Sequence, residues 1–487
     1  MQWGVRRSAI AAACALVVGG LALPALATGP ERPAATVTVD CHGGAVQVPA
    51  DYLGLSVEWS MVERWFGAHQ TRPVQSTVTL LRSIGSTGVL RIGGNSQDGY
   101  RFDGGRSTAN NKLFEGRITL GMVGALMEVA ARSGWRVVLG LNLRVNDPAQ
   151  AAALTRHALR VDRGMRLLAV EPGNEPTVYF GTNHSGHLAR VARYVAALDA
   201  DPVTRGTPIV GPALANLVDL ELLRRMPGIY GNRMPFATWH HYANRPSITR
   251  LLGPDVETDW ATRLAQVAAA APGVPTRMGE GNSVGRGGMR NVSDVSGSAV
   301  WLADAMLAGA AAGLAGYNAH SWDQAYYPKE GWTSWYTPFV VRAGRVQARP
   351  GVYGMAMLRD LPGSRMCATT LRDGDGQRLR VYAAVDPQNR LRVWVLDKSG
   401  APSKDGVLIV PPAGYSGHAQ LSRLQDAGGC AGRAPRAEGA RMGADGKLTW
   451  TPALLEPTAN LEGYRVRLAP CMLALVEFLP PEVLPTP

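Results

Sequence analysis

The stretch RLLAVEPGNEP, residues 166–176, joins a short apolar run to a polar tip that carries two glutamates. The run RLLAVE is almost continuous in apolar residues, which is typical of a strand buried on both faces of a sheet. A carboxylate is costly to bury unless it is paired or hydrogen-bonded. We therefore expect Glu175, which follows Gly-Asn at the end of this strand, to have a partner elsewhere in the chain.

Seven further β-like runs resemble residues 166–171, and Ala-rich, helix-like stretches separate them. The runs are YLGLSVE (52–58), GVLRIGG (88–94), RVVLGLNL (136–143), PIVGP (208–212), FATWHHY (236–242), PTRMGE (275–280) and LAGYNAH (314–320). Helical patterns cover, for example, residues 120–134, 187–201 and 258–273, and several end at Gly. Eight strands alternating with helices predict a (β/α)8 TIM barrel. A doubly wound sheet would also alternate, but its Gly-rich phosphate fingerprint is absent after the first strand.

From about residue 335 the helical periodicity fades, and β-like runs are separated by Gly, Pro and Asp turns. This texture predicts a C-terminal all-β module, a β-sandwich. The β-like segment 35–49 precedes the first barrel strand and is expected to pair with that module. The predicted organisation is a signal peptide at 1–27, an N-terminal strand segment at 28–50 that joins the β domain, the catalytic barrel at 51–335 and the β-sandwich domain at 336–487.

The first 27 residues have the pattern of a secretory signal. Arg6-Arg7 precede an apolar run, and Ala25-Leu26-Ala27 fits the small-x-small rule, which predicts cleavage after Ala27. The alternative is an uncleaved membrane anchor, because the apolar run is almost long enough to span a bilayer. We expect a secreted protein, extracellular or periplasmic, without membrane association once the signal is removed.

The cysteine pattern and the net charge indicate the compartment, cofactors and partners of the protein. Removal of Cys14 with the signal leaves Cys41, Cys367, Cys430 and Cys471, an even number that predicts disulfides in an oxidising compartment, with three possible pairings. No CxxC, CxxH or other metal-ligand spacing occurs, so we expect no metal and no cofactor. The net charge is +12, but the basic residues are scattered and no nucleic-acid motif is present, so we expect no nucleic-acid partner.

Polar residues follow most of the predicted barrel strands at their C-terminal ends, where the active sites of such barrels lie. They are Glu58, Asn95-Ser96, Asn174-Glu175, Asn216, His240-His241-Tyr242, Glu280 with Asn282, and Asn318 with His320. Carboxylates, amides and aromatic rings are the groups that bind sugar hydroxyls and sugar C–H faces. The pattern predicts a carbohydrate substrate.

Glu175 and Glu280 are the candidate catalytic pair. Hydrolysis of a glycosidic bond requires one carboxyl that protonates the leaving oxygen and a second that attacks or stabilises the anomeric carbon. The fourth and seventh strands lie across the barrel mouth from each other, so their tips can flank a sugar. Asn174 could then bond the sugar 2-hydroxyl, whereas Glu171 is expected to be structural. The alternative is that both glutamates are rim carboxylates in salt bridges.

Five motifs together resemble glycoside hydrolase family 79, the β-glucuronidase and heparanase-like group of the retaining barrel clan. They are GLSVEWS (54–60), LRIGGNSQD (90–98), EPGNEP (171–176), TWHHY (238–242) and MGEGNSVGRGGMRNVSDVSGSAVWLADAML (278–307). They occur in the family's order, and a β domain follows, as in the family. The resemblance implies a retaining enzyme that cleaves β-linked glucuronides through a covalent glycosyl-enzyme intermediate.

The resemblance also implies residue roles. Glu175 would be the general acid/base and Glu280 the nucleophile. The sugar subsite would be lined by Glu58, Asn95, Asn174, Asn216 and Tyr242. Backbone N–H groups near Gly287 would meet the uronic carboxylate, since consecutive N–H groups form an anion-binding nest.

The chain departs from the family at one position of the loop that follows Glu280. Glucuronidase-like members often carry a tyrosine five residues after the nucleophile, but this chain has Gly285 there, followed by Arg286. Arg286 could replace the lost hydroxyl with a charge-assisted bond to carboxylate, or it could point to solvent.

Several alternatives remain open from sequence. Adjacent His240 and His241 point to opposite faces of a strand, one to the core and one to the barrel mouth, which argues against a metal site. His320 and Trp322 could form a sugar platform or pack in the core. The aromatic residues between 326 and 336 could wall the leaving-group side or pack between domains.

The function itself also has alternatives. The enzyme could act on a neutral sugar or arabinofuranoside, or could be endo-acting and heparanase-like; a carbohydrate-binding protein with an inactive barrel is the non-enzyme alternative. The presence of both glutamates favours an enzyme, and we expect a monomer.

Overall fold

The computed structural model describes residues 35–43, 46–69, 72–103, 114–323, 334–376, 378–400, 406–415, 417–433, 436–438, 440–458 and 462–479. The predicted signal peptide, Cys14 and the aromatic residues from 326 to 332 lie outside these ranges. Within them, no helix combines the length and the apolar character that crossing a bilayer requires.

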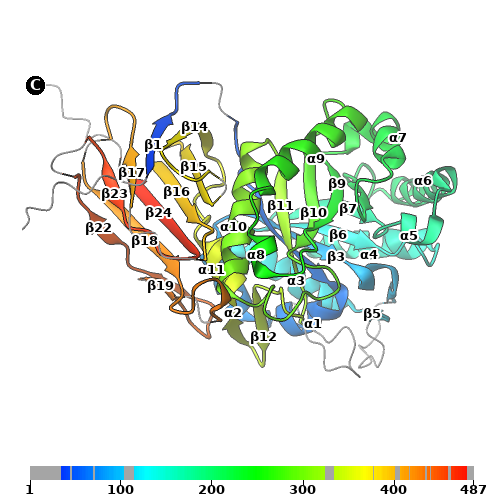
Figure 1. Cartoon of the computed structure of the whole chain (residues 1–487). Coiled ribbons are helices and arrows are strands. Elements are labelled where there is room, and N and C mark those ends of the chain that lie inside the picture. The colour runs from blue at the N-terminus through cyan, green and yellow to red at the C-terminus, as the bar shows by residue number, and fades with distance from the viewer. Residues whose placement is uncertain are drawn as a thin grey trace, which may run out of the picture. The chain divides into compact units, whose positions relative to one another are not determined.

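Eight parallel strands form a barrel in the order β7-β6-β3-β2-β11-β10-β9-β8 (Figure 1). Their bounds are β2 Leu53–Glu58, β3 Val89–Gly93, β6 Arg136–Leu141, β7 Leu167–Pro172, β8 Gly211–Leu214, β9 Ala237–Tyr242, β10 Thr276–Asn282 and β11 Gly316–Ser321. The barrel closes between β7 and β8, where Val210 N–H donates to Val170 O and Val170 N–H donates to Pro208 O, each at 2.9 Å. The predicted (β/α)8 barrel is confirmed, and the strands are almost entirely buried, as near-continuous apolar runs require.

Helices connect the strands along the chain. They are α1 Trp59–Phe66, α2 Gln75–Ile84, α3 Leu120–Ser133, α4 Pro148–Val161, α5 Thr177–Phe180, α6 His184–Ala200, α7 Glu221–Tyr230, α8 Ile248–Leu251, α9 Val256–Ala270 and α10 Ser296–Ala311. Local sequence sets their ends. The Thr119 hydroxyl accepts the Met122 N–H at the start of α3, and Gly134 ends that helix at φ 87°. Asp147 caps α4 in the same way, directly before Pro148.

A hairpin and a short helix follow the barrel and pack against it. They are β12 Phe339–Arg342, β13 Arg345–Ala348 and α11 Pro350–Ala356. The ring centroids of Phe339 and Trp65 of α1 are 4.9 Å apart, and Val352 and Met355 of α11 belong to the core that the barrel helices build. The predicted β-sandwich domain covers residues 336–487. Within this range β12 and β13 form a separate two-stranded sheet, and the chain enters the large C-terminal sheet at Arg365. The strands of a hairpin that packs on the barrel have the same pattern of apolar and turn residues as the strands of the large sheet. The sequence pattern therefore does not distinguish the two.

The C-terminal sheet is mostly antiparallel and includes an N-terminal strand. In the order of the chain, eight of its strands are β1 Ala35–Asp40, β14 Arg365–Arg372, β15 Leu379–Val385, β16 Leu391–Asp397, β17 Val407–Val410, β18 Ala419–Gln425, β23 Tyr464–Val466 at one edge, and β24 Met472–Phe478. Four short strands extend one edge, namely β19 Arg436–Glu438, β20 Ala440–Met442, β21 Leu448–Trp450 and β22 Ala453–Leu455. β1 pairs with β14 and β17, so the two ends of the chain share one sheet.

Both predicted disulfides lie in this part of the chain. One joins Cys41 to Cys367, just after β1 and within β14, and the other joins Cys430 to Cys471. The sequence left three pairings open. In the observed pairing one bond joins cysteines 326 residues apart in sequence, and the other joins cysteines 41 residues apart.

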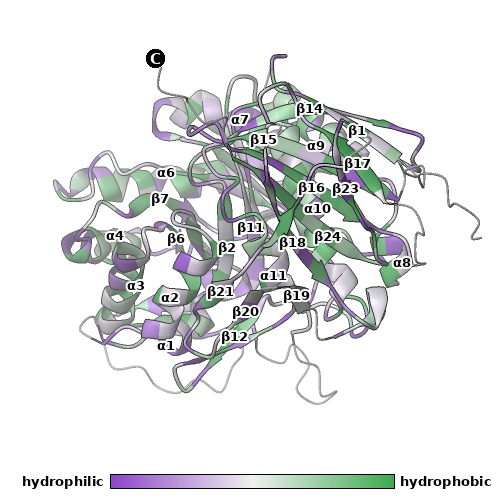
Figure 2. Cartoon of the chain, turned by 90° about the vertical axis from the view of Figure 1, so that its left-hand side faces the viewer, coloured by the Kyte–Doolittle hydropathy of each residue, from purple (hydrophilic) through white to green (hydrophobic). Residues whose placement is uncertain are grey.

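The sheet buries both of its faces. In β16, Val393 and Val395 face a core shared with Val37 of β1 and Ile409 of β17, while Trp394 faces the core that includes the barrel. This alternation follows from the two-residue period of a strand. Figure 2 shows β24 largely hydrophobic along its length. Strands β1, β16 and β17 are not all neighbours in the sheet, yet their side chains meet in one core. The sheet therefore folds over on itself into two layers, as predicted.

A buried ion pair joins the sheet to barrel helix α10. Lys398 Nζ lies 2.9 Å from Asp304 Oδ2, and neither side chain is exposed to solvent. Lys398 also donates to Gly253 O at 2.9 Å, and the Tyr382 hydroxyl donates to Asp304 Oδ1 at 2.7 Å. Each charge is therefore both paired and hydrogen-bonded, which is the condition under which buried ions are tolerated.

We predict that Lys398→Met lowers the free energy of unfolding by about 3–5 kcal/mol, because Asp304 keeps its charge in a buried position without its cation. Urea denaturation at pH 7 measures the loss. Lys447→Met, at an exposed lysine of the same domain, should change stability by less than about 0.5 kcal/mol. A loss below about 1 kcal/mol in Lys398→Met would contradict the prediction.

Candidate active site

A cavity of about 450 Å³ opens at the C-terminal ends of the barrel strands. Residues at or just after the C-terminal ends of all eight strands line it. They are Glu58, Asn95, Asp98, Arg144, Asn174, Glu175, Val178, Tyr179, Ala215, Tyr242, Glu280, Gly285, Arg286, His320, Trp322 and Tyr336. The barrel therefore gathers most of the predicted polar strand ends around one space.

A buried arginine on β3 organises the floor of this cavity. Arg91 Nε donates to Glu171 at 2.6 Å, and Nη1 donates to Glu280 at 2.7 Å and to Ser56 Oγ at 3.1 Å. Nη2 donates to Asn174 Oδ1 at 2.8 Å. Burial alone would lower the pKa of Arg91, but the two carboxylates outweigh it and raise the pKa above its usual value. The guanidinium thus stays charged and fixes four polar side chains at once.

Glu280 of β10 is buried but surrounded by groups that favour its charged form. Its Oε1 accepts a hydrogen bond from the Tyr242 hydroxyl at 2.7 Å. Its Oε2, which accepts from Arg91, lies 3.6 Å from His320 Nδ1. Burial alone would raise the pKa of Glu280, but His320, His240, Arg91 and the Tyr242 hydrogen bond outweigh it and hold the pKa well below its ordinary value. Glu280 is therefore an ionised carboxylate at neutral pH.

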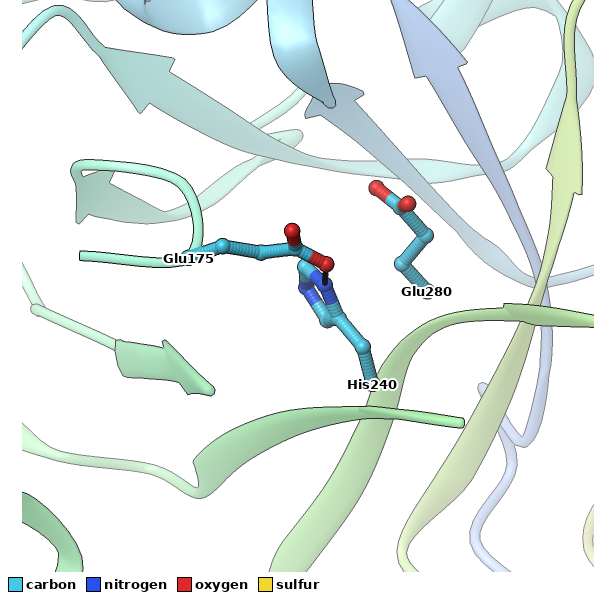
Figure 3. Close-up of side chains that lie close together, drawn as sticks. All are labelled: Glu175, His240 and Glu280. Atoms are coloured by element: carbon cyan, nitrogen blue, oxygen red, sulfur yellow. Dashed lines mark hydrogen bonds and ion pairs between the residues drawn. The ribbon is translucent and has the colours of Figure 1, made fainter. Parts of the chain in front are cut away.

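Glu175 approaches the same space from the tip that follows β7 (Figure 3). Its side chain is 22% exposed, and its Oε1 lies 2.9 Å from His240 Nδ1. An oxygen of Glu175, an oxygen of Glu280 and a ring nitrogen of His240 all lie within 4.8 Å of one another. One carboxylate is thus buried beside an arginine, while the other is partly open to the cavity.

Two carboxylates and an imidazole could also bind a metal ion. Here His240 Nδ1 already faces Glu175, and the two oxygens of Glu280 accept hydrogen bonds from Arg91 and Tyr242. These bonds occupy both oxygens of Glu280 and Nδ1 of His240, and Arg91 brings a positive charge next to Glu280. The arrangement fits proton transfer and nucleophilic attack better than metal binding.

Glu58 lines the cavity from β2 and is held by the turn after β3. Its oxygens accept the N–H of Asn95 at 3.0 Å, the N–H of Ser96 at 2.7 Å and the Ser96 hydroxyl. A Cβ at Gly94 would lie 2.4 Å from the carboxyl carbon of Glu58, and Gly94 has φ 72°. The second glycine of LRIGGN is therefore required for the carboxylate to lie this close to the backbone.

Asn174 is oriented for a ligand by the same arginine. Because Arg91 is a donor, it must face the amide oxygen of Asn174, and the opposite side of the amide carries Nδ2. Asn174 lines the cavity beside Glu175. Its amide N–H₂ is thus the group that can donate to a hydroxyl of a bound molecule.

Two predicted site residues do not reach the cavity. Asn216 is exposed, and its Oδ1 accepts the N–H of Val218 at 2.9 Å, an Asx turn that directs the side chain back to its own loop. Ala215 lines the cavity instead. Gly287 is buried behind the wall, where its N–H lies against the Tyr336 hydroxyl and its carbonyl accepts the Trp335 N–H at 2.5 Å.

Arg286 lies at the rim, exposed and with φ 56°. It forms no ion pair with any residue that the structure describes. Its charge is therefore available to an anionic group in the cavity.

The histidines and Glu171 lie as the sequence indicated. His240 faces Glu175 at the barrel mouth, whereas His241 points outward to Asp259 of α9, with Nε2 3.2 Å from Oδ2. Glu171 is buried between Arg91 and the Thr238 hydroxyl, which lies 2.6 Å away, and its role is structural. His320 and Trp322 both line the cavity.

Sequence reasoning missed four residues that build the site, namely Arg91, Asp98, Arg144 and Tyr179. Arg91 carried a usable signal, because an arginine within the apolar strand GVLRIGG requires buried anionic partners. The other three lie in or near loops, where no pattern marks them.

Comparison with known proteins supports the fold. No protein family and no curated protein sequence matches the chain. Among solved structures, a 4-O-α-L-rhamnosyl-β-D-glucuronidase from Fusarium oxysporum 12S is similar, with a TM-score of 0.71 and 19% identity over 91% of this chain and 99% of that one. A GH51 arabinofuranosidase from Xanthomonas axonopodis pv. citri has a TM-score of 0.68 at 12% identity, over 92% and 100% of the two chains. A monomeric β-xylosidase from Caulobacter crescentus CB15 has a TM-score of 0.60 at 15% identity, over 91% and 99%. The chain therefore has the two-domain fold of these glycoside hydrolases.

Proposed function

We propose that the protein is a retaining glycoside hydrolase of the family 79 type that cleaves β-linked glucuronides. The observation that carries the proposal is the approach of Glu175 and Glu280 oxygens to within 4.8 Å in a cavity. Retaining glycosidases place their carboxyl groups about 5–5.5 Å apart, whereas inverting enzymes need about 6.5–9.5 Å to admit a water. The observed approach favours the retaining class.

The proposed reaction is a double displacement. Glu175 donates its proton to the glycosidic oxygen while Glu280 attacks the anomeric carbon, so the bond to the leaving group breaks and a glycosyl ester forms. A water then attacks the same carbon and gives its proton to Glu175, and the ester bond to Glu280 breaks. Both carboxyl groups return to their starting states.

The surroundings of the two carboxyls support these roles. Glu280 is kept ionised by Arg91, His320 and the Tyr242 hydroxyl, as a nucleophile requires. Glu175 is more exposed and bonds only to His240 among the described side chains, so it can reach a leaving oxygen. The Asn174 amide can donate to the sugar 2-hydroxyl, a bond that strengthens in the transition state.

The choice of a uronic acid rests on Arg286 and on the motifs shared with family 79. An unpaired guanidinium at the rim can form charge-assisted hydrogen bonds to a carboxylate. One of the similar structures is named as a glucuronidase. A neutral sugar is the alternative, because an arabinofuranosidase and a xylosidase share the fold. A binding protein without activity has no need for two converging carboxyls.

We also propose that the protein is secreted and works as a monomer on a carbohydrate substrate. The signal-like residues 1–27 support secretion, and so do the two disulfides, which persist in oxidising compartments.

The first test replaces each carboxyl in turn. Wild type is expected to hydrolyse 4-nitrophenyl β-glucuronide in a panel of nitrophenyl glycosides, and Glu280→Gln should lower kcat on the order of 10⁴-fold or more. Glu175→Gln should lose about 10²–10⁴-fold on unactivated substrates and form β-glucuronosyl azide when azide is added. NMR should show the β-anomer as the first product. An α-anomer first, or full activity in Glu280→Gln, refutes the mechanism.

Arg286 tests the substrate. Arg286→Ala should lower kcat/KM for 4-nitrophenyl β-glucuronide by about 10–100-fold, since hydrogen bonds to charged groups contribute about 1.5–3 kcal/mol. Activity on 4-nitrophenyl β-glucoside should change little. Arg290→Ala is the matched control, because Arg290 lies in the same loop but packs over Trp335, 6.0 Å from the ring centroid. Equal losses on both substrates in Arg286→Ala would remove the uronate role.

Tyr242 tests the charge state of Glu280. Tyr242→Phe removes a hydrogen bond that lowers the pKa of Glu280, so that pKa should rise. Because the nucleophile must be ionised, the acidic limb of the pH profile of kcat/KM should move to higher pH, with a larger loss at pH 4 than at pH 7. Tyr353→Phe, at a tyrosine that does not line the cavity, should leave the profile in place. An unchanged limb in Tyr242→Phe contradicts the assignment.

A further inference from the structure

Asp98 lies where the loops that follow three neighbouring barrel strands meet. It is the last residue of the short helix η1, Asn95–Asp98, which follows β3. Its Oδ1 accepts the N–H of Leu143 at 2.9 Å and of Arg144 at 3.2 Å, both after β6. Its Oδ2 accepts the N–H of Asn174 at 3.0 Å, after β7. One carboxylate therefore ties three loops together at the cavity wall.

The tip that carries Glu175 depends on such ties. Gly173 has φ 87° and Glu175 has φ 46°, a left-handed conformation that is unfavourable for a residue with a side chain. Such conformations persist only where the surroundings over-determine them. The tip must therefore be held from outside.

Three backbone N–H groups hold the tip in place. Gly173 N–H donates to Leu141 O at 3.0 Å, and Glu175 N–H donates to Ala213 O at 3.1 Å. The acceptors of these two are main-chain carbonyls at the ends of β6 and β8. The third N–H, that of Asn174, donates to the Asp98 side chain. Of the three acceptors, only Asp98 can be removed by substitution.

We propose that Asp98 is a positioning residue that holds the Asn174–Glu175 tip at the place from which Glu175 protonates the leaving group. The proposal rests on the proposed function. Asp98 lines the cavity, but its oxygens already accept three backbone N–H groups, so it acts through the tip rather than on the substrate.

Tyr179 belongs to the same arrangement. Burial and the nearby Asp98 carboxylate both raise the pKa of Tyr179, so its hydroxyl stays protonated. That hydroxyl lies 2.8 Å from where a Cβ on Gly173 would be. It therefore fills the space between Asp98 and Gly173, the residue that precedes the Asn174–Glu175 tip.

The proposal predicts that replacement of Asp98 lowers kcat/KM by a factor that depends on the leaving group of the substrate. Glu280 lies on β10, and the Asn174 side chain is held separately by Arg91, so neither depends on Asp98 alone. A displaced Glu175 impairs proton donation, which a poor leaving group needs and a strongly acidic phenol does not. A general loosening of the site would instead slow both kinds of substrate.

The experiment measures kcat/KM of Asp98→Asn on phenyl and on 2,4-dinitrophenyl β-glucuronide, since kcat/KM reports the steps up to cleavage of the glycosidic bond. The substitution keeps the size of the side chain but turns one acceptor into an N–H₂ group that faces a peptide N–H. We expect about a 10²-fold loss on the phenyl substrate and less than about a 3-fold loss on the dinitrophenyl substrate.

Asp162→Asn is the matched control. Asp162 accepts the N–H groups of Gly164, Arg166 and Leu167 at 3.2, 2.9 and 2.9 Å. These residues lie at the N-terminal end of β7, opposite to the end that carries Glu175. It is therefore a similar carboxylate clamp away from the cavity, and its loss should not distinguish the two leaving groups.

Equal losses on the two substrates in Asp98→Asn, or no loss on either, would overturn the positioning role. If Asp98→Asn does not fold, Tyr179→Phe should show the same preference for the dinitrophenyl substrate to a smaller degree, and equal rates would overturn the proposal. If wild type does not act on glucuronides, that substrate assignment fails by itself. The same pair of leaving groups is then compared on the glycoside that wild type does hydrolyse.

Discussion

The buried guanidinium of Arg91 is the interaction on which the rest of the site depends. It neutralises one of the two carboxylates it contacts, so the group of Arg91, Glu171 and Glu280 retains one negative charge inside the barrel. Breaking a buried ion pair is costly because the remaining charge lacks a partner. The planar fork of arginine also fixes directions, which a lysine could not do. Glu280 and Asn174 are therefore positioned by one side chain that belongs to neither of their strands.

Glycine makes room for these charged groups. A Cβ at Gly93 would lie 2.9 Å from Arg91 Cζ, and one at Gly94 would lie 2.4 Å from the carboxyl carbon of Glu58. Real Cβ atoms do not approach other atoms so closely in a packed interior. The two glycines in LRIGGN thus allow an arginine and a glutamate to lie against the turn between strand and loop. A motif that looks like a flexible turn in sequence is here a packing requirement.

The sequence predicted the barrel strands and the residues that the barrel topology brings together. It did not predict side-chain positions that depend on the conformation of a loop. The barrel strands were found because buried strands are apolar throughout, and Asn174, Glu175, Tyr242 and Glu280 lie at strand ends that the fold must bring together. Asn216 also follows a strand, but its side chain caps its own turn, a choice between local and distant hydrogen bonds that spacing does not reveal. The contacts of Arg91 were not predicted because its partners lie on or after other strands, between 35 and 189 residues away in sequence. The β12–β13 hairpin has the strand pattern of the C-terminal module but forms a two-stranded sheet of its own, because a strand pattern does not specify which sheet it joins.

The site separates the groups proposed for chemistry from those proposed for substrate choice. Arg91, Glu171 and Glu280 lie on strands, are buried and are bonded to one another across the barrel. Arg286 lies on a loop, exposed and without an ion pair among the described residues. A change in that loop can alter the charge at the rim without disturbing the buried network, because no hydrogen bond of the network passes through it. This independence lets the charge at the rim vary while the buried network keeps its contacts. It also means that the fold constrains the proposed bond cleavage more strongly than it constrains the sugar.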